Sequence, residues 1–225
     1  NSAPVFQRIK SALIISMEHI ALEKIPHKRI RSFIKAQLNN DLESVKDLEV
    51  SFRHGDSIKE LNKHERSYFA QRNIDDVWNY YIKTGPNKIF TDKLVSFALM
   101  LSKQNESEVL YKEEAFSKAE IGQVYFMNLS ILRGLIQIAV SYEIIEIDPT
   151  KKIIDFAYVK GGKCIGFQRI SFIQEELNRT RIKHTTHYKS NSKFRDRFMY
   201  PYFHTKVLEE YHTNMIGFMT HKLSV

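Results

Sequence analysis

A stripe of apolar residues at helical spacing runs between residues 74 and 82. Its members recur at intervals of three and four residues and are Ile74, Val77, Trp78, Tyr81 and Ile82. This period predicts an amphipathic α-helix, which Gly85-Pro86 would end. Similar patterns predict further helices at residues 5–22, 30–38, 42–52, 57–72 and 91–101. We therefore expect residues 1–104 to form a helical bundle.

The second half of the chain carries a different pattern. Residues 144–147 and 153–159 are rich in β-branched and aromatic side chains and flank an Asp148-Pro149 turn, which predicts a β-hairpin. Further along, the sequence predicts a short strand and two helices, at residues 164–167, 168–177 and 207–219.

A capped helical region precedes the hairpin. Ser117-Lys118-Ala119-Glu120 fits a capping box, and helical character continues to Tyr142 with a break near Asn128. This order of elements resembles a winged helix-turn-helix over residues 117–159, with the helix at 129–142 in the recognition position. The expected fold is therefore mainly α with a small β component, and its region 105–225 is winged-helix-like (helix-helix-β-hairpin). The boundary after residue 104 rests on a polar stretch alone, so a single domain remains the alternative.

Most of the excess positive charge lies in residues 178–206. The whole chain has 34 Lys and Arg against 26 Asp and Glu, a formal net charge of +8, whereas this segment has eight bases and one acid, Asp196. Aromatic side chains alternate with the bases. Because cations neutralise phosphates and rings stack on bases, the segment predicts a nucleic-acid contact. The candidate contacts are Arg179, Arg181, Lys183, Tyr188, Lys189, Lys193, Phe194, Arg195 and Arg197.

A second basic cluster lies on the predicted helix at residues 30–38 and just before it. Lys28, Arg31 and Lys35 share one side of this helix, opposite its apolar positions. Such a face suits phosphates or anionic lipid. An ordinary solvated helix has the same pattern.

The leading interpretation is a non-enzymatic DNA-binding or nucleoprotein-assembly protein, without catalytic residues, cofactor or metal. No Walker loop, dinucleotide fingerprint or nucleophile elbow is present. One alternative is a metal-dependent nuclease that uses Asp155 and Glu175, or the pair His184 and His187 on one helical face. The other is an adaptor that docks protein partners or a second copy through its aromatic C-terminus.

Two further expectations concern location and order. Cys164 is the only cysteine and no apolar run is long enough to span a membrane, which predicts a cytoplasmic protein, or a nuclear one in a eukaryote. Residues 183–192 contain a single large apolar side chain, Tyr188. We therefore expect them to form a mobile loop, because they bury too little surface to offset the entropy of ordering.

Overall fold

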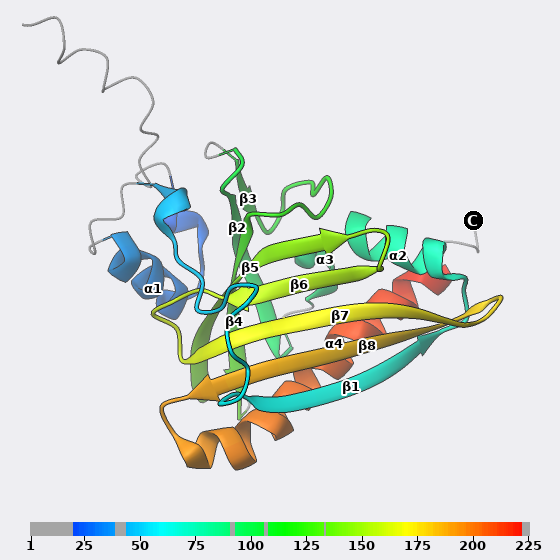
Figure 1. Cartoon of the computed structure of the whole chain (residues 1–225). Coiled ribbons are helices and arrows are strands. Elements are labelled where there is room, and N and C mark those ends of the chain that lie inside the picture. The colour runs from blue at the N-terminus through cyan, green and yellow to red at the C-terminus, as the bar shows by residue number, and fades with distance from the viewer. Residues whose placement is uncertain (1–19, 39–43, 91–92, 106–107, 133, 222–225) are drawn as a thin grey trace, which may run out of the picture.

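The structure, a computed structural model, describes residues 20–38, 44–90, 93–105, 108–132 and 134–221. Its centre is an eight-stranded antiparallel sheet with the strand order β1-β8-β7-β6-β5-β4-β2-β3 (Figure 1). The strands are β1 (Asn62–Ala70), β2 (Val95–Ser102), β3 (Val109–Tyr111), β4 (Gln123–Ile131), β5 (Ile136–Asp148), β6 (Ile153–Tyr158), β7 (Cys164–Glu176) and β8 (Arg179–Ser190). Strands from both sides of residue 104 share this sheet.

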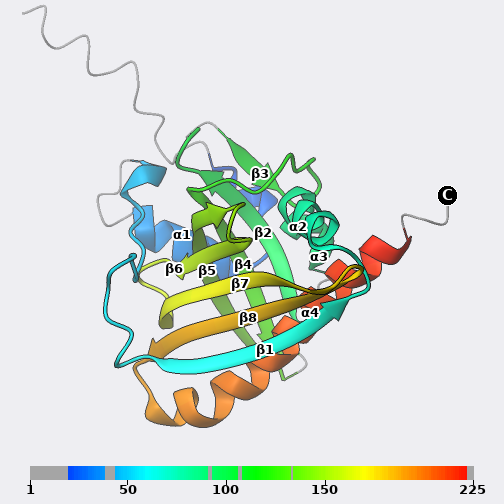
Figure 2. The ribbon, with the colours of Figure 1, turned by 45° about the vertical axis from the view of Figure 1, so that its right-hand side comes forward.

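Four α-helices of the described residues accompany the sheet, and a π-helical turn (Arg195–Met199) leads into the last of them. They are α1 (Lys28–Leu38), α2 (Ile74–Lys83), α3 (Pro86–Ile89) and α4 (Tyr200–His221). The long helix α4 lies along one face of the sheet (Figures 1 and 2). None of the described helices is both long and apolar enough to cross a membrane.

Two hydrophobic cores lie on opposite faces of the sheet. The larger core packs α4, through Met215 and Met219, against α2, α3 and the inner face of the strands. The smaller core packs Ile30 and Ile34 of α1 against the outer face, where Phe126 of β4 is buried. Because β2 contributes side chains to both cores, all of its residues are buried.

The prediction of a mainly α fold is wrong, and β2 illustrates the reason. A strand that is buried on both faces is apolar throughout, so its sequence cannot be distinguished by period from a buried helix. Other ranges predicted as helices form strands as well. Residues 57–72 contain β1, residues 168–177 lie largely in β7, and the expected recognition helix at 129–142 is the turn between β4 and β5 with its flanking strands.

The predicted mobile loop at residues 183–192 is also wrong, since most of it belongs to β8. This strand pairs along its length with β1 on one side and β7 on the other. Its side chains alternate between buried and half-buried positions. The buried positions include Thr180, His184 and Thr186, and these polar residues conceal the alternation that marks a strand.

Other predictions are confirmed. The hairpin at 144–159 is formed by β5 and β6, and in its turn Asp148 accepts hydrogen bonds from the amides of Thr150 and Lys151 at 2.9 Å. The helices α1, α2 and α4 occupy predicted positions. The prediction of a helix at 42–52 is wrong for its described part, residues 44–52, which contains a single 3-10 turn (Val45–Asp47). The predicted helix at 5–22 lies almost wholly outside the described residues.

Two glycines provide a matched test of this fold. Gly166 of β7 has φ +120°, and a Cβ there would overlap the carbonyl group of His187 on β8, whereas a Cβ on Gly217 of α4 meets nothing within 4 Å. We expect Gly166→Ala to lower the free energy of unfolding by about 2 kcal/mol or more. Gly217→Ala should raise it by about 0.5–1 kcal/mol. Urea denaturation measures both, and an equal effect of the two substitutions would contradict the β7–β8 register.

Candidate ligand-binding cavity

A cavity of about 730 Å³ lies between the inner face of the sheet and α4. Its walls are mainly aliphatic and aromatic and include Met127, Leu129, Ile138, Val140, Phe156, Phe203 and Val207. Phe203 and Val207 belong to α4, whereas the others lie on β4, β5 and β6 at alternate positions that point inward. The cavity therefore follows from the strand pattern together with the position of α4 over this part of the inner face.

The cavity extends past one edge of β5 toward α1. β5 pairs with β6 from Tyr142 onward, and the carbonyl group of Ser141 accepts a hydrogen bond from Val159, so residues 136–140 have no β6 partner on that edge. Phe33 of α1 and the turn at residues 161–163 line this part of the cavity. The hydroxyl group of Ser141 is buried here and has no hydrogen-bond partner within the described part of the chain. A buried polar atom without a partner is uncommon in proteins.

A continuous chain of hydrogen bonds runs from α2 to the cavity wall. Distances between neighbouring polar atoms lie between 2.5 and 2.9 Å. The chain passes in order through the side chains of Tyr81 (α2), His212 (α4), His184 (β8), Gln168 (β7), Tyr158 (β6) and Tyr200 (α4). It therefore joins α4 to the sheet at two separate points.

Burial keeps the titratable members of this chain uncharged. Desolvation lowers the pKa of His184 well below its ordinary value and lowers the pKa of His212 to about 3. Desolvation also raises the pKa values of Tyr81, Tyr158 and Tyr200. A group that stays neutral near pH 7 can donate or accept a hydrogen bond, but it is poorly suited to proton transfer.

The neutral rings fix the direction of the hydrogen bonds, because each has one donor and one acceptor nitrogen. Tyr81 donates to His212, which donates to His184. That ring then donates to the side-chain oxygen of Gln168. The amide nitrogen of Gln168 donates to Tyr158, and a single phenolic hydrogen joins Tyr158 to Tyr200. The other phenolic hydrogen of this pair has no acceptor among the described residues, and it can be donated to a ligand.

The cavity favours one sign of charge. Its lining includes the cations Arg29, Lys163 and Arg195, while no Asp or Glu of the described chain lines it. An ammonium group would lose its hydration there without gaining a carboxylate partner. The lining therefore suits a neutral or anionic molecule.

The structure separates the sequence-predicted contact residues into groups. On β8, four of the bases lie within 2.7–3.5 Å of a carboxylate. The pairs are Arg179–Glu176, Arg181–Glu175, Lys183–Glu65 and Lys189–Glu60. The ring of Tyr188 is 2% exposed and stacks on Tyr200 with centroids 3.6 Å apart, so it does not present a face to solvent.

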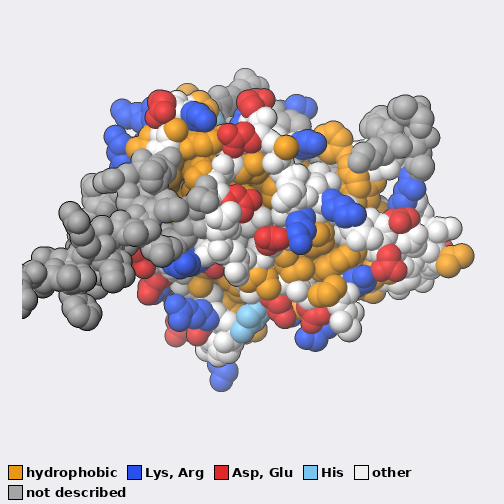
Figure 3. Space-filling view, turned by 90° about the horizontal axis from the view of Figure 1, so that it is seen from above, with side chains coloured by type: hydrophobic (Ala, Val, Ile, Leu, Met, Phe, Trp, Pro, Cys, Tyr) orange, Lys and Arg blue, Asp and Glu red, His pale blue; other side chains and the backbone are white. Residues whose placement is uncertain are grey.

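The remaining candidates lie elsewhere. Lys193, Phe194, Arg195 and Arg197 are at the start of the C-terminal helix, while Lys28, Arg31 and Lys35 are on α1. On the face seen in Figure 3, Lys and Arg side chains are interspersed with Asp and Glu. Nucleic-acid binding by these groups stays a prediction.

The residues of the predicted nuclease sites do not come together. His184 and His187 point to opposite faces, because they are three residues apart on a strand and not on a helix. Asp155 lies opposite Arg169 in the β6–β7 register, and Glu175 is six residues further along β7, where it binds Arg181 at 2.9 Å.

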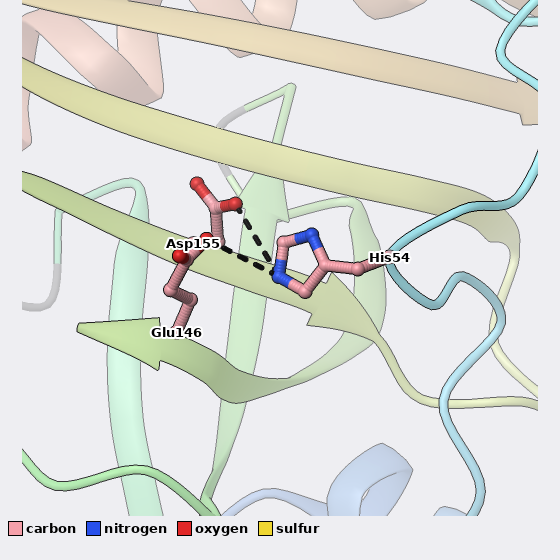
Figure 4. A group of neighbouring side chains, drawn as sticks. All are labelled: His54, Glu146 and Asp155. Carbon is pink, nitrogen blue, oxygen red and sulfur yellow. Dashed lines mark ion pairs between the residues drawn. The ribbon is translucent and has the colours of Figure 1, made fainter. Parts of the chain in front are cut away.

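A separate polar cluster lies over β5 and β6, where His54 points between two carboxylates (Figure 4). Its Nε2 is 3.3 Å from Glu146 and 3.7 Å from Asp155, and the three groups are close enough together to hold a metal ion. However, Arg169 already donates to both oxygens of the buried Asp155, at 2.6 and 2.7 Å. Glu146 and Asp155 are directly opposite in register, where like charges repel. Arg169 and the imidazole offset this repulsion, so the cluster is explained as an ion-pair network.

Comparison with known proteins identifies the fold alone. No protein-family model matches the sequence, and no curated protein matches it. A norcoclaurine synthase structure from Thalictrum flavum, in complex with dopamine and hydroxybenzaldehyde, has a TM-score of 0.52 at 12% identity and covers 78% of this chain and 96% of that one. Ginseng major latex-like protein 151 from Panax ginseng has a TM-score of 0.50 at 14% identity, covering 71% and 97%. The chain therefore has a Bet v 1-like fold, and the winged-helix prediction is wrong.

The buried histidines predict a pH-dependent stability. In the folded chain His184 and His212 stay unprotonated, whereas in the unfolded chain imidazoles bind a proton below their ordinary pKa of about 6.5. The unfolded state then binds more protons, so the free energy of unfolding falls as the pH falls, by up to about 1.4 kcal/mol per pH unit for each such histidine. Urea denaturation at pH 7 and pH 5 measures this loss. In the variant His212→Asn, the free energy of unfolding should depend less on pH. An unchanged pH dependence would contradict the conclusion that His212 is unprotonated in the folded protein.

Proposed function

We propose that the protein binds a small, largely apolar molecule, neutral or anionic, in the cavity beneath α4. The observation that carries the proposal is the cavity itself, which combines about 730 Å³ of volume with apolar walls and a few polar groups. Ligand sites in proteins have this size and this composition. A void of such volume would otherwise be a costly defect in a packed core.

The polar groups define the ligand further. The free phenolic hydrogen at Tyr158 and Tyr200 requires an acceptor, such as a carbonyl, carboxylate or hydroxyl oxygen. Aromatic lining residues such as Phe156 favour a ring system. The ligand is therefore an aromatic or similarly apolar molecule with one or two oxygen atoms.

The similar fold that holds dopamine and hydroxybenzaldehyde supports a small aromatic ligand as the class. Of these two molecules, dopamine suits the present cavity less well, because it carries an ammonium group and no described carboxylate lines the cavity. An aldehyde or phenol oxygen, in contrast, suits the phenolic donor.

Binding is favoured over acid–base catalysis by the state of the hydrogen-bond chain. Catalytic acids and bases have pKa values near the working pH. Here burial moves the pKa values of the tyrosines upward and those of the histidines downward, away from neutrality. The chain of hydrogen bonds therefore fixes the orientation of the phenolic donor at Tyr158 and Tyr200.

Filling the cavity should abolish binding of an apolar probe. We expect the wild-type chain to bind the anionic dye anilinonaphthalene sulfonate saturably, with a rise in fluorescence. Val140→Trp places an indole in the cavity and should weaken this binding by about tenfold or more. The matched control is Ile165→Trp, since Ile165 is 45% exposed on β7 and does not line the cavity. Equal dye binding by the two variants would contradict the proposal.

Removing the phenolic donor should affect only ligands that have an acceptor. The double variant Tyr158→Phe/Tyr200→Phe keeps the rings but also removes one bond between α4 and the sheet. We therefore expect the affinity for naphthaldehyde to fall two- to tenfold (about 0.5–1.5 kcal/mol) relative to the affinity for naphthalene. Competition with the dye measures both affinities. Tyr81→Phe, at the far end of the chain, is the control that alters the hydrogen bonds without touching the cavity. Equal losses for both ligands would show that the donor does not contact them.

A further inference from the structure

Exposed aromatic rings and exposed cations lie together around the start of the C-terminal helix. The rings of Phe194, Phe198 and Tyr202 are 65%, 58% and 56% exposed and are spaced four residues apart. Three exposed cations accompany them. We call the six residues the helix-start patch: Lys193, Phe194, Arg197, Phe198, Tyr202 and Lys206.

The rings and cations of the helix-start patch contact one another. The rings of Phe194 and Phe198 have centroids 5.4 Å apart, and the guanidinium group of Arg197 is 5.6 Å from the ring of Phe198. The ammonium group of Lys206 is 4.3 Å from the centre of the Tyr202 ring. The patch is thus an apolar ridge edged with positive charge.

The charge of the patch is not neutralised. Within the described residues, none of its three cations forms an ion pair with a carboxylate, whereas the bases of β8 are paired across the sheet. The one acid of this region, Asp196, is buried and accepts a hydrogen bond from the amide of Ser190. The free positive charge of residues 178–206 is therefore concentrated beside the exposed rings.

A second exposed apolar element lies beside the cavity beneath α4. In the turn between β4 and β5, Leu132 and Leu135 are 53% and 86% exposed. Leu132 also has φ 51°, a left-handed conformation that is unfavourable for leucine. Ile136, next to this turn, and Phe203, next to the patch, both line the cavity. Two apolar projections therefore border one cavity.

We propose that the helix-start patch docks on an anionic lipid bilayer, with the β4–β5 turn as a second point of contact. Aromatic and leucine side chains have a lower free energy in the bilayer interface than in water, and the flanking cations are attracted to the lipid phosphates. The exposed leucines distinguish this partner from a nucleic acid, which offers them no apolar phase. In addition, single-strand binding uses a basic groove and not a ridge. The proposal does not depend on the identity of the cavity ligand.

Vesicle co-sedimentation of the full chain tests the proposal. We use vesicles of phosphatidylcholine alone and vesicles with about one third phosphatidylserine. We expect binding to the anionic vesicles that weakens as salt is added. Phe194→Ala/Phe198→Ala and Leu135→Ser should each retain the native circular dichroism spectrum, because these side chains are exposed. The double variant should lose about tenfold or more in vesicle affinity, and Lys193→Glu/Arg197→Glu a similar factor.

A ring-and-cation pair elsewhere on the surface supplies the matched control. Phe69 of β1 is 42% exposed and lies 4.7 Å from the guanidinium carbon of Arg179. Phe69→Ala/Arg179→Gln should bind anionic vesicles as the wild type does. Equal binding by this control and by the patch variants would overturn the proposal. Binding of an oligonucleotide with no binding to vesicles would overturn it as well and would assign the patch to nucleic acid.

Discussion

The position of α4 depends on directional hydrogen bonds as well as on apolar packing. A helix that covers a sheet across a cavity of about 730 Å³ makes incomplete contact with the strands below it. His212 and Tyr200 compensate for this, because both belong to the hydrogen-bond chain and they are separated by about 18 Å along the helix. With its two attachment points fixed, α4 can cover the sheet without filling the space beneath it. The cavity and the helix are therefore consequences of one arrangement.

The elements that could be predicted from the sequence are those with one apolar face. Ile74, Val77 and Trp78 of α2 form such a face, and so do the strands around the Asp148 turn. Two strands that the sequence does not predict, β2 and β8, lack the alternation of apolar and polar residues that marks a strand. β2 is buried on both sides, while the inward positions of β8 include the polar residues Thr180, His184 and Thr186, of which His184 belongs to the hydrogen-bond chain. In both strands the tertiary environment, and not the local pattern, determines which side is buried.

The candidate site was less predictable than the fold, because its residues come from distant parts of the chain. The hydrogen bond between Tyr81 and His212 joins residues 131 positions apart. The sequence does contain one signal, since five of the nine histidines lie in the last 42 residues. The sequence shows the basic residues of β8 as a cluster. It does not show the carboxylates that pair with Lys183 and Lys189, because these lie on or beside β1. Charge is visible in a sequence, whereas its neutralisation depends on the fold.

The two separate cores have a consequence for how quickly a ligand exchanges. α1 covers the part of the cavity beside the unpaired edge of β5, and it is held by the smaller core on the outer face. A displacement of α1 widens the cavity without breaking any hydrogen bond that positions α4. Local opening of this kind has a smaller free energy than global unfolding. We therefore expect substitutions at Ile30 or Ile34, which belong to the smaller core, to change the residence time of a ligand.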